Sequence, residues 1–268
     1  MIITGFHSIE EKLRAVKEKD VKSKGKGAAD DGLKLYYSKP GPRVKKILAA
    51  AKEAGVSAVQ VEDTKLDSLV AELDETLRDH RGIVMEIKEG KQKASNIVDF
   101  DSWIKTHSHD LQEADKPCTV VMLDSVTDPH NVGAIIRSCD QFGAALVILP
   151  EHNSASNIAG NEVIGRSSAG ASVWVPVTIV KNLVRAAEQL KNAGFWIYGA
   201  DAGGENCRKI DFAKKSVIIM GSEGTGIAQF LEKQCDTIVS IPTCGKIDSL
   251  NVSVAAGVLL YELYARQN

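Results

Sequence analysis

From residue 119 onward the chain alternates between short apolar runs and longer stretches with helical spacing. Several apolar runs are continuous (VVML, LVIL and VIIM), which is typical of strands buried on both faces of a parallel sheet. The pattern predicts strands over residues 119–124, 145–149, 173–177, 195–199, 216–220 and 237–241. It predicts helices over residues 131–142, 158–166, 181–193, 226–234 and 249–266. This order indicates an α/β domain with helices on both faces of a parallel sheet.

The first ninety residues also alternate between helical and strand patterns. The predicted helices are Ser8–Lys19, Pro42–Ala54 and Leu66–Leu77, and the predicted strands are Leu33–Ser38, Ala58–Val61 and Gly82–Ile87. Residues 91–117 are polar and lose this period, apart from Ile97–Ile104, which suits a short helix. We therefore expect an N-terminal α/β domain over residues 1–90, a linker over 91–117 and a second domain over 118–268.

The composition of the 268 residues, with 44% hydrophobic and 25% charged residues, excludes wholesale disorder. The longest uncharged apolar run, Val252–Tyr261, is far shorter than the roughly 20 residues that cross a bilayer. The first twenty residues lack the apolar segment of a secretory signal, so we expect a cytoplasmic protein with no membrane partner. The five cysteines are odd in number and widely spaced, which argues against a disulfide framework and against a metal site.

The formal net charge of −2 gives no overall attraction to nucleic acid, but the charge is unevenly distributed. Between Lys12 and Lys46 there are twelve Lys and Arg against four acidic residues. This excess suits a phosphate-rich partner. A solvated lysine-rich surface with a disordered loop through Lys22–Asp31 explains it equally well.

In parallel α/β sheets, ligands bind beyond the carboxyl ends of the strands, which here directs attention to the loops after Leu123, Met220 and Ile241. In the first loop, LDSVTDPHNVGAIIRS, Asp128-Pro129 predicts a turn and Asn131 is a good candidate helix N-cap. Arg137 follows six residues later, and taken alone it is compatible with an ordinary surface salt bridge.

The second loop, GSEGTG over Gly221–Gly226, contains three glycines that favour positive φ or a close approach of the backbone to a ligand. It lacks the Lys-Ser/Thr of a phosphate-binding loop, and Glu223 would repel phosphate, which favours a hydroxyl or cationic ligand. The third loop, IPTCGKIDSLNVSVA, offers Ser249 as a candidate N-cap, and leaves Ser249 and Asn251 free to bind something at the helix start.

Taken in this order, DPHNVGAIIRS, GSEGTG and IP…G…SLNVSVA resemble the SpoU/TrmH family of SPOUT RNA methyltransferases, and they span Leu123–Glu262. The DPHN form and the preceding α/β domain are similar to the branch that methylates a guanosine ribose in large-subunit ribosomal RNA. Its N-terminal domain resembles RNA-binding ribosomal proteins. The chain departs from that branch in the basic insertion near Lys22–Asp31, in its long linker and in Cys244 within the third motif.

The resemblance implies a C-terminal domain whose chain threads a deep trefoil knot, with S-adenosylmethionine as the cofactor and no metal. The cofactor-binding residues that it implies are Met220, Gly221, Ile241, Ser249 and Leu250. It also implies a homodimer formed through the knot domain. The last predicted helix is suited to this because it carries more apolar positions than one intramolecular face needs, namely Val252, Ala256, Leu259, Leu260 and Leu263.

The implied reaction is methyl transfer to a ribose 2′-hydroxyl in RNA. The catalytic residues that the resemblance implies are Arg137, Asn131, Glu223, Ser249 and Asn251. A guanidinium with a pKa above about 12 is a poor base, so we expect Arg137 to bind the RNA phosphate and orient the ribose. The phosphate or a water molecule would then receive the proton, while the other four residues position Arg137, cofactor and ribose.

Three alternatives remain open at this stage. In the first, the RNA substrate is a transfer RNA. In the second, the chain is a non-catalytic RNA-binding factor in ribosome assembly. In the third, it is a nucleotide-dependent oxidoreductase on a similar sheet. The intact polar set around Asn131 and Glu223 argues against the second alternative. The lack of a dinucleotide fingerprint after Leu123 argues against the third.

Overall fold

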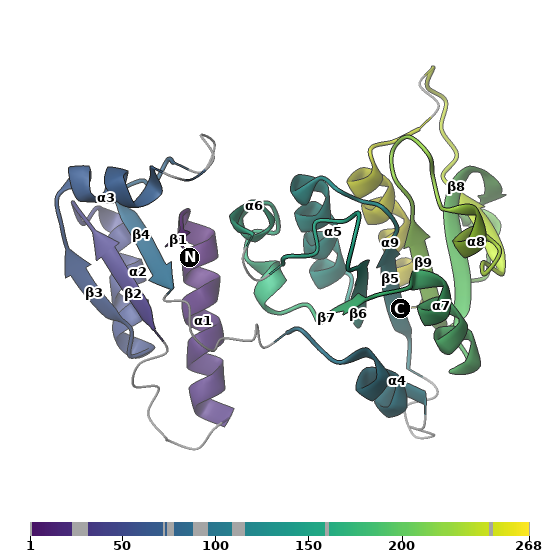
Figure 1. The fold of residues 1–268 in the computed structure, drawn as a ribbon, viewed down its shortest axis with the longest axis horizontal. Coiled ribbons are helices and arrows are strands. Elements are labelled where there is room, and N and C mark those ends of the chain that lie inside the picture. The colour runs from purple at the N-terminus through teal and green to yellow at the C-terminus, as the bar shows by residue number, and fades with distance from the viewer. Residues whose placement is uncertain are drawn as a thin grey trace. The chain divides into compact units, whose positions relative to one another are not determined.

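A computed structural model describes residues 2–22, 32–71, 73, 78–87, 96–108, 116–158, 161–246 and 249–267. The chain forms two compact units, and each is described by itself (Figure 1). The first unit contains Met1–Ser95 and Ile158–Trp174, and the second contains Asn96–Asn157 and Val175–Asn268. The loop Lys22–Asp31 lies outside the described residues from position 23 onward.

The first unit is built on a mixed four-stranded sheet in the order β1-β4-β2-β3. Its strands are β1 (Ile2–Ile3), β2 (Leu33–Tyr37), β3 (Ser57–Gln60) and β4 (Ile83–Ile87), and its longer helices are α1 (Phe6–Lys22), α2 (Pro42–Glu53) and α3 (Asp63–Val70). Side chains alternate across β4, so Ile83 and Met85 join the core beneath α1 and α2. Val84 faces the other way and packs with Leu66 of α3. Helices therefore cover both faces of this sheet.

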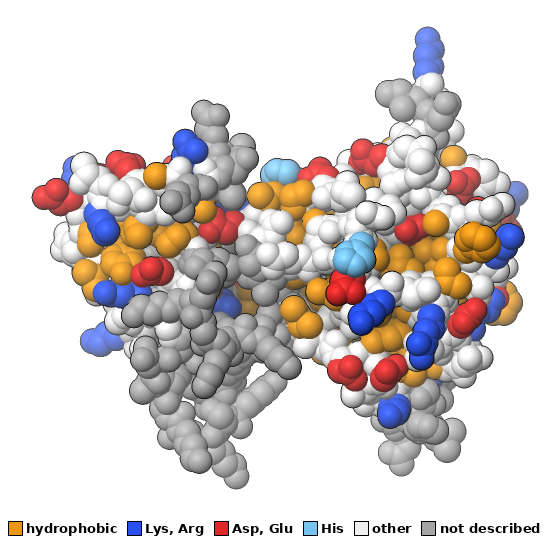
Figure 2. Space-filling model, in the orientation of Figure 1, with side chains coloured by type: hydrophobic (Ala, Val, Ile, Leu, Met, Phe, Trp, Pro, Cys, Tyr) orange, Lys and Arg blue, Asp and Glu red, His pale blue; other side chains and the backbone are white. Residues whose placement is uncertain are grey.

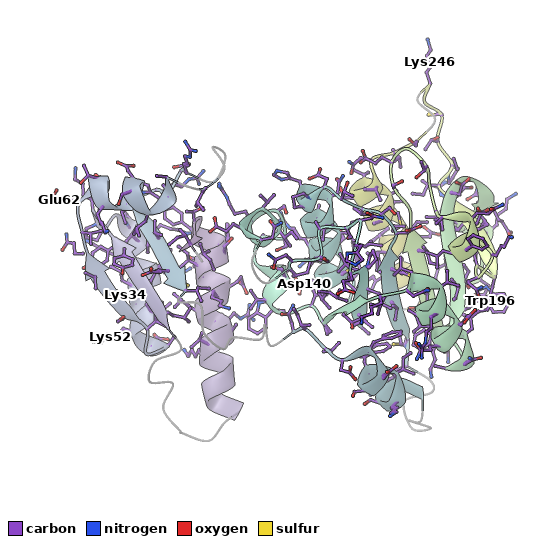
Figure 3. All side chains as sticks on the ribbon, in the orientation of Figure 1. Lys34, Lys52, Glu62, Asp140, Trp196 and Lys246 are labelled. Atoms are coloured by element: carbon purple, nitrogen blue, oxygen red, sulfur yellow. The ribbon has the colours of Figure 1, made fainter. Side chains whose placement is uncertain are left out.

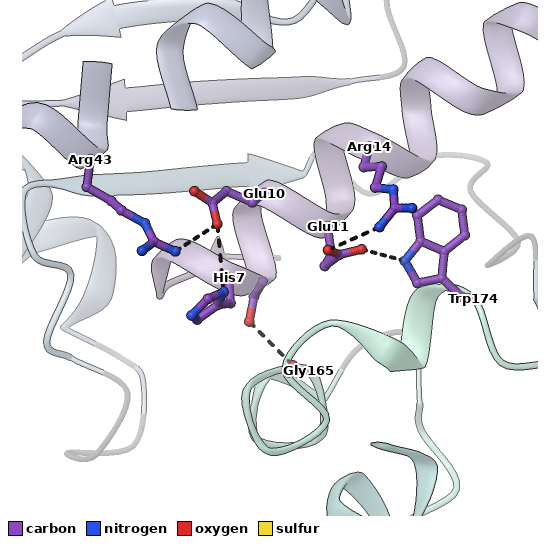
Figure 4. Close-up of polar contacts among 8 residues, drawn as sticks. His7, Glu10, Glu11, Arg14, Arg43, Gly165 and Trp174 are labelled. Atoms are coloured by element: carbon purple, nitrogen blue, oxygen red, sulfur yellow. Dashed lines mark hydrogen bonds and ion pairs between the residues drawn. The ribbon is translucent and has the colours of Figure 1, made fainter. Parts of the chain in front are cut away.

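The segment Ile158–Trp174 groups with α1 of the first unit, although the sequence pattern assigns it to the second domain. It forms α6 (Glu162–Ser167) and a 3-10 turn, η2 (Ala171–Val173). Figure 4 shows its polar contacts with α1: Ser8 Oγ donates to the Gly165 carbonyl oxygen at 3.3 Å, and Trp174 Nε1 donates to Glu11 Oε2 at 2.7 Å. The Arg14 guanidinium lies 5.6 Å from the centre of the Trp174 ring. The chain thus passes between the two units three times.

The second unit contains a six-stranded sheet in the order β10-β8-β9-β5-β6-β7, and every neighbouring pair is parallel, as the continuous apolar runs predict. The strands are β5 (Cys118–Leu123), β6 (Leu146–Pro150), β7 (Val177–Val180), β8 (Trp196–Asn206), β9 (Lys215–Met220) and β10 (Thr237–Ser240). The helices are α4 (Phe100–Ser108), α5 (Pro129–Gln141), α7 (Leu183–Asn192), α8 (Gln229–Glu232) and α9 (Val252–Gln267).

Helices cover both faces of this sheet as well. One face packs against α4, α7 and α8 in a single core that includes Val120 and Met122 of β5. The other helices, α5 and α9, pack against each other on the opposite side (Figure 1). The α/β class with a parallel sheet is therefore confirmed. Among the helices within the described ranges, none combines the length and the hydropathy needed to cross a membrane.

Several elements differ from those expected. Part of the segment expected to be a linker, Phe100–Ser108, is the helix α4, because Phe100 and Trp103 are buried in the core of the second unit. Residues 91–95 and 109–115 of that segment lie outside the described residues. The helix expected over residues 226–234 shrinks to α8, since Gly226 has a φ of +67°, outside the helical region. Strand β8 continues to Asn206 through a glycine-rich stretch that carries no strand signal.

The five apolar positions of the last helix that were expected to form a dimer surface do not lie on the surface. All five (Val252, Ala256, Leu259, Leu260 and Leu263) are at most 5% exposed within the single chain, because α9 packs on its own unit. A different set of large apolar side chains on α9 is exposed, namely Val254, Val258, Tyr261 and Tyr264. The first three recur at positions i, i+4 and i+7, so they form one stripe.

Candidate active site

The first two motif loops leave the same edge of the sheet side by side. Strands β5 and β9 pair in register up to Leu123 and Met220, the last residues before the loops. The next residue, Asp124, is buried and joins the two loops: its backbone N–H donates to the Met220 carbonyl at 2.8 Å. Its Oδ2 accepts a 2.7 Å hydrogen bond from the backbone N–H of Ala228. Sequence reasoning missed Asp124, although an acidic residue directly after a buried strand is a usable signal.

Three amide and carboxylate side chains, one from each motif loop, form a hydrogen-bonded cluster. Glu223 Oε1 accepts from Asn131 Nδ2 at 3.1 Å and from Asn251 Nδ2 at 2.7 Å. Asn251 Nδ2 also donates to Asn131 Oδ1 at 3.0 Å. In the sequence, Asn131 and Glu223 lie 92 positions apart, Glu223 and Asn251 lie 28 apart, and Asn131 and Asn251 lie 120 apart. Only the fold brings them together. We call them the Asn-Glu-Asn cluster.

Both expected N-caps are wrong, because a different side chain caps each helix. Helix α5 is capped by Asp128, whose Oδ1 accepts from the backbone N–H of His130 at 2.8 Å. Asn131 is therefore already inside the first turn, where its side chain is free to bind across the loops. At the start of α9, Asn251 rather than Ser249 accepts from the backbone N–H of Ser253, at 2.9 Å.

The sequence suggested that Asn251 is free to bind a ligand at the helix start. In the structure both ends of its side-chain amide are already engaged in hydrogen bonds. Its Oδ1 satisfies the first turn of α9 while its Nδ2 holds Glu223 and Asn131. Ser253 Oγ adds a 2.6 Å hydrogen bond to the same Oδ1. These bonds fix which end of the amide faces the helix, so the third motif loop is anchored to the other two.

The structure does not bring Arg137 to this cluster. On α5, Arg137 follows Asn131 by six residues, which places it about 9 Å along the helix axis and about 120° around it. Its side chain is exposed, and it has no hydrogen bond or ion pair with the part of the chain that the structure describes. Within the described residues Arg137 therefore has no hydrogen bond to Asn131, Glu223 or Asn251, and its positioning by them stays a prediction.

A cavity of about 850 Å³ opens between the second and third motif loops and the middle of β8. All five residues expected to bind the cofactor line it: Met220, Gly221, Ile241, Ser249 and Leu250. Glu223 lines it too, which connects the cavity to the Asn-Glu-Asn cluster. Asp201 and Ala202, from the middle of β8, complete a wall that sequence reasoning missed because no strand was expected beyond residue 199.

The backbone of the second motif loop is tightly folded. Ser222 and Gly226 exchange two backbone hydrogen bonds of 3.0 and 3.1 Å, which close a small hairpin. Gly221 has no positive φ, but a Cβ there would overlap the backbone of Gly226 and Ile227. Glycine is therefore needed at this position because the backbone of the loop passes close to its own later residues, and not only because a ligand could approach it.

The cysteines give this site no evident chemistry. Burial raises the pKa of the Cys235 thiol to about 12 and raises that of Cys139 further, so both remain protonated thiols at neutral pH. Cys244, in the third motif loop, is exposed. Among the described residues, no three His, Cys, Asp or Glu side chains are grouped to hold a metal ion.

The family model of the SpoU rRNA methylase family matches residues 118–261, which is more than half of the chain and contains all three motif loops. This confirms the resemblance inferred from the motifs. The 23S rRNA (guanosine-2'-O-)-methyltransferase RlmB of Ralstonia nicotianae is 32% identical over 97% of this chain and 94% of its own length. The enzyme of the same name from Pseudomonas putida is 33% identical over 82% of each chain.

Solved structures support the fold. The SpoU methyltransferase AviRb from Streptomyces viridochromogenes, in complex with AdoMet, covers 99% of this chain and 89% of its own with a TM-score of 0.67 and 21% identity. An RNA 2'-O ribose methyltransferase covers 99% of this chain and 88% of its own, with a TM-score of 0.69 and 20% identity.

Proposed function

Because this chain belongs to the SpoU rRNA methylase family, it is an RNA methyltransferase, and we propose that it transfers a methyl group from S-adenosylmethionine to a ribose 2′-hydroxyl of ribosomal RNA. The guanosine-specific names of the Ralstonia and Pseudomonas relatives support a guanosine of the large-subunit RNA. The observation that carries the proposal is that the Asn-Glu-Asn cluster shares Glu223 with a large cavity. Such an arrangement places a cofactor pocket beside a polar site for substrate.

The cavity suits S-adenosylmethionine in size and chemistry. Its volume of about 850 Å³ falls within the range of small-molecule sites. Its walls combine apolar side chains (Met220, Ile241, Leu250) with loop backbone near Gly221, which suits a flat base that needs hydrogen bonds to the main chain. Among its described lining residues, none is Lys or Arg, which fits a cofactor without phosphate. We propose Met220, Gly221, Ile241, Ser249 and Leu250 as the residues that hold it.

When bound, the cofactor supplies an activated methyl group on a positively charged sulfur. The chain must then orient the ribose and find an acceptor for the hydroxyl proton. The Asn-Glu-Asn cluster keeps the three loops in one arrangement, and Ser249 lines the cavity. Arg137, exposed and without a partner among the described residues, is suited to bind an RNA phosphate in a bidentate way. The phosphate or a water molecule receives the proton.

We propose that the first unit binds the RNA. On α2 and the loop before it, Lys39, Arg43, Lys45 and Lys46 are exposed. Arg43 is paired with Glu10 at 3.0 Å, which leaves the three lysines as the stronger phosphate contacts. Figure 2 shows basic and acidic side chains interspersed over the drawn face of this unit, so the described surface there is mixed in sign. Such mixed charge favours modest, salt-sensitive binding.

We further propose that the second unit contains the trefoil knot of its family and forms a homodimer in the cytoplasm, where ribosomal RNA is modified. The exposed stripe Val254, Val258 and Tyr261 on α9 is the surface that supports a dimer. Tyr261 also packs edge-on against Phe142 of α5, with ring centres 5.8 Å apart, so α5 and α9 share this surface.

The test is to map 2′-O-methylation in total RNA from cells with and without this protein. Loss of one guanosine methylation in large-subunit ribosomal RNA, restored by the wild-type gene and not by an Asn251→Ala variant, is expected. Loss of a transfer-RNA methylation would assign the substrate to the alternative class. An unchanged map, together with no S-adenosylmethionine binding by calorimetry, would favour the non-catalytic assembly factor.

A further inference from the structure

The cavity beside the motif loops is lined by two carboxylates and no cation among the residues that the structure describes. The carboxylates are Asp201, in the middle of β8, and Glu223, in the second motif loop. The described basic residue of the third loop, Lys246, does not line the cavity and projects away from the unit at the tip of that loop (Figure 3). A ligand in this cavity is therefore surrounded by negative charge.

Asp201 is placed there by a large irregularity in β8. The pairing with β10 jumps from Gly199–Ile238 to Glu205–Val239, so residues 200–204 leave the ladder with β10, and the first three of them form part of the cavity wall. Gly204 allows this path, because a Cβ there would lie 2.6 Å from the backbone of Ile238. Asp201 Oδ1 accepts from the backbone N–H of Gly203 at 2.8 Å, which holds the carboxylate in a tight turn.

The second oxygen of Asp201 is available to the cavity. Oδ2 lies on the side of Gly226, 3.6 Å from the position that a Cβ of that glycine would occupy. It has no hydrogen bond with the residues described by the structure. The carboxylate thus reaches the backbone of the second motif loop without being neutralised by a partner within the described chain.

We propose that Asp201 is a specificity-determining residue that, together with Glu223, makes the cavity distinguish by charge between S-adenosylmethionine and its demethylated product. This inference rests on the cofactor of the proposed function. At neutral pH, S-adenosylmethionine carries a net charge of +1 from its sulfonium, and S-adenosylhomocysteine, a thioether, is neutral. Two carboxylates attract the first and not the second, so this wall favours binding of the methyl donor over binding of the spent product.

The size of the effect follows from Coulomb's law. Opposite unit charges at about 4 Å in a water-like dielectric change an equilibrium about fivefold, and more in a partly desolvated cavity. Removing one carboxylate should therefore lower the preference for the donor about fivefold. Added salt should lower it too, because exposed charges are screened over roughly 8–10 Å near physiological ionic strength.

The experiment measures the dissociation constants of both ligands by calorimetry on the full-length protein, and compares wild type with Asp201→Asn. Asparagine keeps an oxygen for the Gly203 N–H, so the turn is preserved while the charge is lost. We expect the ratio of the two constants to fall about fivefold, through weaker binding of S-adenosylmethionine. The matched control is Glu205→Gln, which removes one charge from the same strand outside the cavity and should leave the ratio unchanged.

A third variant, Asp201→Glu, retains the charge and should retain most of the preference. The inference is overturned if Asp201→Asn binds both ligands with the wild-type ratio, or if Asp201→Glu loses the preference as Asp201→Asn does, which would make shape the cause. Either result leaves the proposed function intact as long as the wild-type protein binds S-adenosylmethionine. If the wild-type protein binds neither ligand, the proposed function itself fails. Thermal melts of each variant verify that it is folded.

Discussion

Replacing Gly221 by alanine tests whether the second motif loop must fold tightly on itself to form the cavity. The added Cβ would overlap the backbone of Gly226 and Ile227. That backbone belongs to the small hairpin closed by Ser222 and Gly226, so the hairpin has to move away from β9. Forcing one extra carbon into a packed site typically costs about 1–3 kcal/mol. Because Gly221 and Gly226 both line the cavity, we expect that cost to appear in ligand binding.

A cost of about 1–3 kcal/mol corresponds to roughly five- to 150-fold weaker binding of S-adenosylmethionine. Calorimetry measures the affinity, and urea unfolding measures the free energy of unfolding of the same sample. Gly224→Ala is the matched control: a Cβ there meets nothing within 4 Å, and its φ is not positive. We expect that variant to remain within about 0.5 kcal/mol of wild type in both measurements.

The reasoning is refuted if Gly221→Ala binds the cofactor as tightly as wild type. It is equally refuted if Gly224→Ala weakens binding as much as Gly221→Ala, because the loss would then follow from any side chain in the loop and not from the close approach at Gly221.

Three further perturbations address the substrate, the first unit and the assembly. Arg137→Ala should leave cofactor affinity unchanged and lower the single-turnover methylation rate at saturating RNA at least about a hundredfold. Arg137→Lys should restore little of this rate. An unchanged rate in Arg137→Ala would mean that Arg137 contributes only to RNA binding. Burial raises the pKa of Glu162 to about 7, so its folded form retains a proton that the unfolded form loses near its ordinary value. The resulting stabilisation is fully present below about pH 4 and is lost as the pH rises through about 7; melts at pH 5 and pH 8 should show this fall in wild type and not in Glu162→Gln. Tyr261→Arg, on the exposed stripe of α9, should reduce the mass measured by light scattering from that of a dimer to that of a monomer, whereas a monomeric wild-type protein would contradict the proposed dimer.

The sequence was sufficient to predict which loops would meet. Continuous apolar runs such as those at β5 and β9 identify strands buried on both faces, and the carboxyl ends of parallel strands lie at one edge of the sheet. The convergence of the loops after Leu123 and Met220 is a direct consequence. The five residues expected around the cofactor line one cavity for the same reason.

The sequence could not predict which side chains pair within the loops. Asn131 and Asn251 are both residue types that cap helices, but Asp128 caps α5, so Asn131 binds only across the loops, while Asn251 both caps α9 and binds across the loops. The path of β8 was equally hidden, because its glycine-rich stretch has low strand propensity and the strand continues only because Glu205 and Asn206 pair with β10 again. Long-range contacts therefore override the local signal at both places.

The assignment of Ile158–Trp174 to the first unit has a consequence for how the protein folds during synthesis. The contacts of Ser8 and Glu11 with Gly165 and Trp174 cannot form until residue 174 has been made, 79 residues after residue 95 (174 − 95). At roughly 5–20 residues per second, this delay is about 4–16 s. During that interval the surface of α1 that later meets this segment is without its partner, while most strands of the second unit have yet to be translated. The N-terminal unit therefore cannot complete these contacts before the second unit is partly translated.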